Sequence, residues 1–104
     1  MSSPELRRLT LVYPPTIEDE LVELLLDYAP ELPGFTTLAA AGHGGDFTRA
    51  SPRERVRGRV ARGMLLMVLP AAAVDALLAH LAARIHNPHV VWWMEPVIGF
   101  GALA

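Results

Sequence analysis

The sequence predicts an α+β fold in which four strands and two helices follow one another in the order β-α-β-β-α-β. Three observations lead to this prediction. Apolar runs of strand length occur four times, two further stretches carry apolar residues at helical spacing, and Pro or Gly separates most of these segments. A chain of 104 residues is expected to form one domain, which spans residues 1–104.

The first two elements are a strand and a helix. Residues 9–13 alternate with the period of two that is typical of a strand, and Pro14-Pro15 ends it. Thr16 is the predicted N-cap of a helix over 16–28, and Asp19, three positions later, resembles the acidic partner of a capping box. The predicted buried face of this helix, including the two residues that widen it, consists of Leu21, Val22, Leu24, Leu25, Leu26 and Tyr28.

A second strand is predicted over 35–41, and it leads into a long polar segment. The strand ends in Gly42-His43-Gly44-Gly45, and six arginines follow between Arg49 and Arg62. We therefore expect a flexible loop over about 43–62, because loops of this length in compact domains are usually functional or disordered. If the last part of the loop is extended, four arginines share one face: Arg53, Arg55, Arg57 and Arg59.

The second half of the chain is predicted to form a strand over 64–69, a helix over 71–85 and a strand over 90–94. Pro70 and Asn87-Pro88 separate these elements, and Pro96 is expected to break the chain before a short edge strand over 97–100. The apolar face of the helix consists of Val74, Leu77, Leu78, Leu81 and Ile85. The whole order is that of the ferredoxin-like βαββαβ sandwich, a four-stranded antiparallel sheet with two helices on one face.

The strands over 64–69 and 90–94 are apolar on both faces, although two helices can cover only one face of the sheet. The other face, which we call the open face, would expose a large apolar patch in a monomer, and such patches usually mark interfaces. We therefore expect the open face to pack against copies of the same chain in a closed cyclic oligomer. Trp92 and Trp93 are expected on opposite faces, in core and interface packing.

Composition excludes several classes of function. The chain has no cysteine, which removes disulfides, thiol catalysis and thiolate metal sites. No apolar run approaches the roughly 20 residues of a membrane span, and the N-terminus does not resemble a signal peptide, so we expect a cytoplasmic protein without membrane insertion. The net charge is −2 and no aromatic residues are interleaved with the arginines, which argues against nucleic acid. No nucleophile and base can be paired, so no enzyme is predicted.

The polar segment holds the candidate ligand contacts. Gly42, His43 and Gly44 lie at a strand end, where backbone N–H groups can approach an anion. Guanidinium groups match phosphates and carboxylates, so Arg55, Arg57 and Arg59 are candidate contacts to a small anionic ligand. A solvated loop, or one that contacts a partner protein, explains the same arginines.

Two histidines form a candidate metal site. His86 and His89 are three residues apart, and two imidazoles at this spacing can chelate Zn or Cu. Surface or helix-capping histidines are the alternative interpretation of this pair.

The chain resembles the PII-like superfamily of signalling proteins over nearly its whole length. The residues from Leu9 to Pro14 resemble the first strand and its exit, Gly34-Phe35 to Gly42-His43-Gly44 resembles the second strand leading into the T-loop, and Met64 to Pro70 resembles the third strand. The stretch Ser51 to Arg59 looks closest to an uncharacterised PII-like family that is encoded beside heavy-metal efflux pumps. The resemblance implies a homotrimer of nitrogen-regulatory-protein type, with ligand sites in clefts between subunits under the T-loop.

One departure from the PII pattern concerns the B-loop. Nucleotide-binding PII proteins have a Gly- and Lys-rich B-loop before the last strand, whereas this chain has only Ile85-His86-Asn87-Pro88-His89. The resemblance therefore does not carry ATP or ADP binding over to this chain. The short, His-containing connection looks more like the CutA divalent-cation tolerance proteins.

The resulting expectation is a trimeric regulatory protein that binds a metal ion or an anionic metabolite and then meets a membrane transporter, such as a metal efflux pump. A ligand-free oligomeric adaptor and a CutA-like protein of metal homeostasis are the alternatives.

Overall fold

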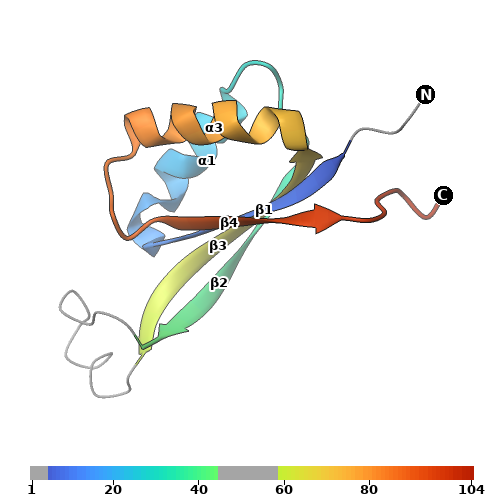
Figure 1. The fold of residues 1–104 in the computed structure, drawn as a ribbon. Coiled ribbons are helices and arrows are strands. Elements are labelled where there is room, and N and C mark those ends of the chain that lie inside the picture. Colours follow the sequence, from blue (N-terminus) through green and yellow to red (C-terminus); the bar gives the residue numbers. More distant parts are fainter. Residues whose placement is uncertain (1–4, 45–58) are drawn as a thin grey trace.

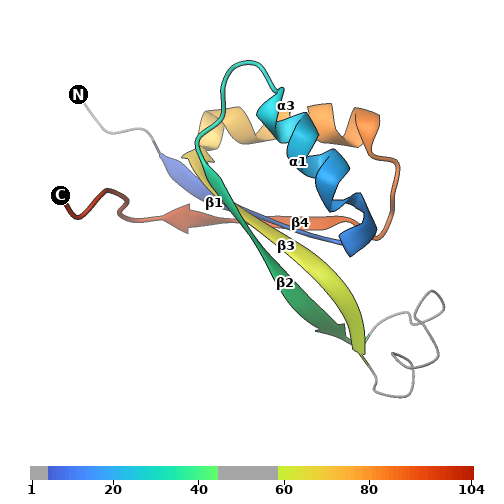
Figure 2. The same cartoon turned by 180° about the vertical axis from the view of Figure 1, so that it is seen from behind.

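The structure, a computed structural model, describes residues 5–44 and 59–104 and confirms the predicted α+β architecture (Figure 1). The elements are β1 (Leu6–Tyr13), the 3₁₀ turn η1 (Pro15–Ile17), α1 (Glu18–Leu26), β2 (Phe35–His43), β3 (Arg59–Pro70), α3 (Ala71–Arg84) and β4 (Val91–Val97). The four strands form one antiparallel sheet in the order β2-β3-β1-β4. Both helices lie on the same face of this sheet, as the opposite views in Figure 1 and Figure 2 show.

The hydrophobic core lies between the helices and the two central strands, β1 and β3. Leu11 stands opposite Leu65 of β3 and Trp92 of β4, so these three side chains lie side by side on the helix-covered face of the sheet. Alternation along each strand turns every second side chain toward the helices. The buried apolar residues are Leu9, Leu11, Tyr13, Leu21, Leu25, Leu65, Met67, Leu69, Val74, Leu77 and Leu81.

The start of the first helix differs from the prediction. Thr16 lies inside η1, and neither η1 nor α1 has a side-chain hydrogen bond at its N-cap, so the expected capping box is wrong. The two prolines before Thr16 explain the difference, because Pro15 takes the first position of the 3₁₀ turn and leads the chain into α1 without a cap. Leu26, predicted to widen the buried face, is 70% exposed because it lies on the far side of the helix.

The middle and last strands are longer than predicted. β2 continues through His43 and β3 begins at Arg59, so both ends of the segment expected to be a loop over about 43–62 are strand. β4 runs through Pro96 to Val97, and no separate strand follows over 97–100. A proline fits here because β4 is an edge strand, where a missing N–H need not break a ladder hydrogen bond.

Gly63 of β3 leaves space for the ring of Tyr13. The two residues are partners in the β1–β3 ladder, and Tyr13 is completely buried. A Cβ at position 63 would collide with Cε2 of the Tyr13 ring and would lie 2.8 Å from its Cζ. Glycine is therefore required at this position for steric reasons, and its backbone dihedral angles play no part in the requirement.

Replacing Gly63 with alanine should destabilise the protein by about 1–3 kcal/mol, because the added methyl group forces the buried ring out of its place. Thermal unfolding of Gly63→Ala measures the effect. The matched control is Gly99→Ala, where an added Cβ meets nothing within 4 Å. Equal melting temperatures for the two variants would contradict the assigned packing of the ring.

Candidate functional site at the base of the β2–β3 hairpin

The far half of the β2–β3 hairpin is a two-stranded ribbon that extends beyond the body of the protein. β1 ends at Tyr13, which pairs with Gly63, so the residues of β3 before Gly63 pair only with β2. The ribbon reaches as far as the pair His43 and Arg59, and Figure 2 shows it projecting away from both helices. The candidate residues Gly42, His43 and Arg59 therefore lie on a projecting arm.

The two glycines of the candidate motif have different structural roles. Gly44, which follows β2 directly, has a φ of +79°, a conformation that glycine adopts without steric cost. Gly42 is a strand residue, and a Cβ at its position would lie 3.4 Å from Cγ of Arg62. Gly42 therefore makes room for the stem of an arginine on the neighbouring strand.

The arginines of β3 lie on both sides of the ribbon. Arg59 is paired with His43 and Arg62 with Ala40, and the alternation of a strand turns these two guanidinium groups to opposite faces. Nη1 of Arg62 donates a hydrogen bond of 3.2 Å to the carbonyl oxygen of Ala61. Arg55 and Arg57 lie outside the described residues, so their predicted alignment with Arg59 stays a prediction.

An open hollow of about 320 Å³ lies where the ribbon joins the body of the protein. The hollow is lined by residues of η1, β2 and β3 and by the first residue of α1. Two of the lining residues are ionisable: Glu18 and Arg62. The remaining lining residues are Pro15, Thr37, Leu38, Ala39, Ala40, Ala61 and Gly63. The small side chains of β2 and β3 make this hollow. Glu18 lines it from the helix side of the sheet, whereas strand alternation starts the Arg62 side chain from the open face.

A hydrogen bond fixes the carboxylate of Glu18. The hydroxyl of Tyr13 donates to Oε1 of Glu18 at 2.7 Å. Burial of the phenol, together with this hydrogen bond and the negative charge of Glu18, raises the pKa of Tyr13 well above its ordinary value. Tyr13 therefore stays protonated and keeps Glu18 in position across the physiological pH range.

The structure places the two candidate metal ligands beside a tight turn. The backbone N–H of His89 donates to Oδ1 of Asn87 at 2.9 Å, and the N–H of Val90 donates to the carbonyl oxygen of Asn87 at 3.2 Å. Among residues 5–44 and 59–104, no three His, Asp or Glu side chains are grouped so that they could hold a metal ion. Metal binding at His86 and His89 would therefore need a further ligand from elsewhere.

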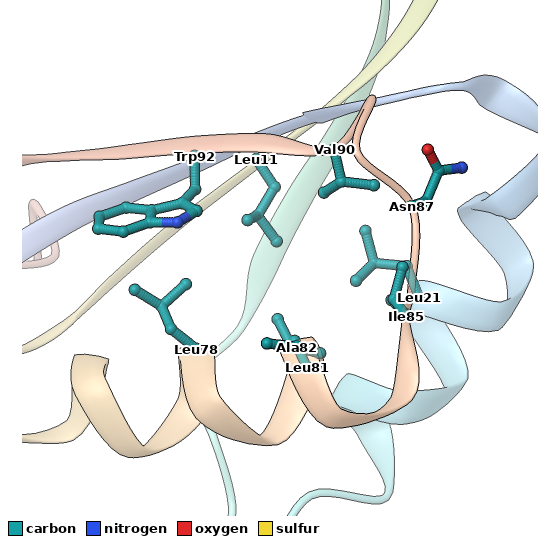
Figure 3. A pocket seen from close by; sticks show the side chains of 9 residues that line it. All are labelled: Leu11, Leu21, Leu78, Leu81, Ala82, Ile85, Asn87, Val90 and Trp92. Carbon is teal, nitrogen blue, oxygen red and sulfur yellow. The ribbon is translucent and has the colours of Figure 1, made fainter.

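The open face of the sheet is apolar, with one polar cluster. Exposed apolar side chains stand on its two edge strands: Leu38 is 43% exposed, Val91 50% and Trp93 42%. Trp92 faces the other way, toward α3, as Figure 3 shows, so the predicted placement of the two indoles on opposite faces is confirmed. This apolar face is the one that the sequence predicted to be an interface.

The polar cluster joins Arg8 of β1 to Glu95 and Trp93 of β4. Oε1 of Glu95 accepts hydrogen bonds from Nη2 of Arg8 at 2.7 Å and from the indole N–H of Trp93 at 3.1 Å. The hydrogen bond from Arg8, followed by that from Trp93, lowers the pKa of Glu95. Sequence reasoning missed this cluster because only the strand register brings Arg8 opposite Glu95.

The lowered pKa of Glu95 predicts the pH dependence of its contribution to stability. A carboxyl group whose folded pKa lies below its unfolded value stabilises the fold above the unfolded pKa and loses this effect as the pH falls through the folded pKa. Glu95→Gln should therefore be less stable than the wild-type protein at pH 7, and the difference should shrink below about pH 4. Urea unfolding at both pH values measures it. A difference that is constant with pH would contradict the role of the charge.

Comparison with solved structures places the fold among the PII-like proteins. CPII from Thiomonas intermedia, a nitrogen regulatory PII-like protein solved with ADP, AMP and bicarbonate, is 19% identical with a TM-score of 0.66, covering 94% of this chain and 97% of that one. B. subtilis GlnK in complex with ATP is 14% identical with a TM-score of 0.64, covering 91% and 85%. At these identities the likeness shows a shared fold.

The chain belongs to the DUF3240 family, described as a protein family of unknown function, which matches residues 3–104. A crystal structure of a DUF3240 family protein from Shewanella baltica is 24% identical with a TM-score of 0.76, and the alignment covers 100% of both chains. Comparison with the curated proteins gives no match. The predicted association with heavy-metal efflux pumps and the likeness to CutA stay predictions.

Proposed function

We propose that this protein is a cytoplasmic PII-like regulatory protein that assembles as a homotrimer and binds a small anionic ligand at clefts between subunits. In this proposal, the ribbon of β2 and β3 with the segment 45–58 then contacts a membrane transporter. The observation that carries the proposal is the projecting ribbon, which has an open hollow lined by Arg62 at its base and the pair His43 and Arg59 at its far end.

The chemistry of the hollow favours an anion with hydrogen-bond donors of its own. Arg62 can bind a phosphate or carboxylate. The carboxylate of Glu18 can accept hydrogen bonds but cannot donate them, and it repels a second negative charge. A nucleoside monophosphate has one anionic group and several hydroxyl donors, and bicarbonate has one of each. CPII, which shares the fold, was solved with AMP and bicarbonate among its ligands. These two anions are therefore our first candidates.

The connection between α3 and β4 argues against high affinity for a nucleoside triphosphate. Between Arg84 and Val91 the chain makes a turn closed by Asn87, and this turn contains neither glycine nor lysine. A triphosphate needs several converging N–H groups or cations, which glycine-rich and lysine-containing loops supply. The proposal accordingly places AMP and bicarbonate ahead of ATP.

The homotrimer is supported by the apolar open face and by the PII-like fold. One repeated contact between copies can close into a ring, and burying the exposed indole of Trp93 and its apolar neighbours favours such a contact. The hollow at the base of the ribbon is open to solvent, so a neighbouring subunit has room to complete it.

Binding of AMP and bicarbonate should depend on Arg62. Isothermal titration calorimetry with the wild-type protein should show binding of at least one of these anions, and Arg62→Gln should weaken it about tenfold or more, because a charge-assisted hydrogen bond contributes roughly 1.5–3 kcal/mol. The control is Arg84→Gln, an exposed arginine at the end of α3 whose Nη1 donates to the carbonyl oxygen of His80. It should bind normally.

Zn²⁺ and ATP complete the set of probes. Zn²⁺ binding that disappears in the double variant His86→Ala, His89→Ala would show that the protein binds a metal ion at these histidines and would favour a metal ion over an anion as its ligand. No binding of any probe by an intact oligomer would overturn the ligand part of the proposal and leave the adaptor interpretation.

The open face should control the oligomeric state. Val91→Glu places a charge among the exposed apolar side chains of this face, while the fold of each protomer stays intact because Val91 is already half exposed. Light scattering after size-exclusion chromatography should give a trimer for the wild-type protein and a monomer for Val91→Glu. Leu26→Glu, on the exposed side of α1, is the matched control and should remain trimeric. A wild-type monomer would contradict the assembly.

A further inference from the structure

An apolar pocket of about 200 Å³ lies on the other side of the sheet, where α3 passes over the edge strand β4 (Figure 3). Leu78, Leu81 and Ile85 of the helix layer face Val90 and Trp92 across it. The hollow at the base of the β2–β3 ribbon has none of these lining residues, so the pocket is distinct from it.

The chemistry of the pocket selects an apolar occupant. Asn87 is the polar residue of its lining, and Oδ1 of that side chain already accepts a hydrogen bond from the backbone of His89. Within residues 5–44 and 59–104, no charged side chain lines the pocket. On the rim, Trp92 is 50% exposed, and Met94, two residues along the same face of β4, is 39% exposed. A complementary surface must therefore be apolar and must cover the strip from Met94 to Trp92.

The same chain carries such a surface in the segment that follows β4. Residues 98–103 read Ile-Gly-Phe-Gly-Ala-Leu, and they include no charged residue. Ile98 and Leu103 are 105% and 108% exposed, as open to water as in an extended peptide, and Phe100 is 73% exposed. Figure 1 shows that this segment leaves β4 at the end that is farther from the pocket. Phe100 also lines a hollow with Leu66 and Val68 of its own β3, whereas Ile98 and Leu103 are fully exposed. Two exposed apolar surfaces of one chain are thus at opposite ends of the same strand.

The segment cannot place Leu103 in the pocket of its own chain by folding back along β4. A two-residue turn at Ile98 and Gly99 would bring Phe100 opposite Val97 and Leu103 opposite Met94. Leu103 would stop two residues before Trp92, roughly 7 Å short at the rise of a strand. A hairpin of this kind therefore leaves the pocket of its own chain unfilled by Leu103, and the same side chain of a second copy is free of this restriction.

We propose that the segment Ile98–Leu103 of one copy docks along β4 of a second copy, with Leu103 inserted into the pocket beside Trp92. The proposal rests on the self-association proposed above and adds a second contact to the open face. Each copy gives one segment and receives another, so the contact is head-to-tail, and such contacts close into a ring when the rotation between copies permits. The docked segment covers Met94 and Trp92, so the interface between copies extends from the open face around the edge of β4.

Cysteine cross-linking tests the proposal cleanly because the chain has no cysteine of its own. Leu103→Cys and Ala82→Cys are prepared separately, since Ala82 lines the pocket and is exposed enough to accept the change. The two proteins are unfolded, refolded together and mildly oxidised, and intact mass spectrometry separates the mixed disulfide dimer from the two symmetric ones. The matched control pairs Leu103→Cys with Ala83→Cys, an exposed neighbour outside the pocket lining.

The mixed dimer should form at least tenfold faster with Ala82→Cys than with Ala83→Cys. Equal rates, or no mixed dimer from a protein that still has the mass of an oligomer, would overturn the docking and leave the open-face assembly standing. A double variant that forms its disulfide within one chain would place the segment on its own protomer and also overturn the docking. A monomeric mass for the wild-type protein would overturn both contacts.

Discussion

The contact between the ring of Tyr13 and the bare backbone of Gly63 sets the boundary between the packed body of this protein and its projecting arm. Because nothing occupies the side-chain position at 63, the ring of Tyr13 lies beside Gly63 at the last pair of the β1–β3 ladder. Its hydroxyl then reaches Glu18 at the start of α1 and links the helix layer to the end of the sheet. Beyond this point β2 and β3 have only each other, and the ribbon that carries the candidate ligand contacts begins.

The position of this boundary gives the candidate site its mixed character. On the side of the body, Glu18 is held by a buried phenol and has little freedom. On the side of the arm, Arg62 belongs to a two-stranded ribbon, and isolated ribbons of this kind are only marginally stable in water. The two ionisable residues of the hollow thus belong to parts of the protein that differ in how firmly they are held.

The fold was predictable from the sequence because its determinants are local or periodic. Pro14, Pro70 and the Asn87-Pro88 pair separate segments with clear periods of two or 3.6, and the order of these segments is that of the ferredoxin-like unit. The error at Thr16 was local, because Pro15 takes the first position of η1 and Thr16 is not a cap. The error at Pro96 depended on neighbours in space, because a proline is expected to end a strand until β4 is known to be an edge strand.

The candidate site was only partly predictable, for the same reason. The glycines and arginines near 42–62 are visible in the sequence, but the partnership of Glu18 with Tyr13 and that of Arg8 with Glu95 depend on strand register. Gly63 gave no signal of the close approach of Tyr13, because the third strand was predicted to begin at residue 64, whereas β3 begins at Arg59.

Pro96 also bears on how copies of this protein can meet. The two edges of the sheet are chemically unequal, because β4 contains a proline that cannot donate a backbone hydrogen bond, whereas β2 has none over its nine residues. A foreign strand can therefore add to the β2 edge along its whole length, but pairing along β4 is interrupted near its end. Copies that approach β4 are thus directed away from fibre-like extension of the sheet and toward contacts made by side chains.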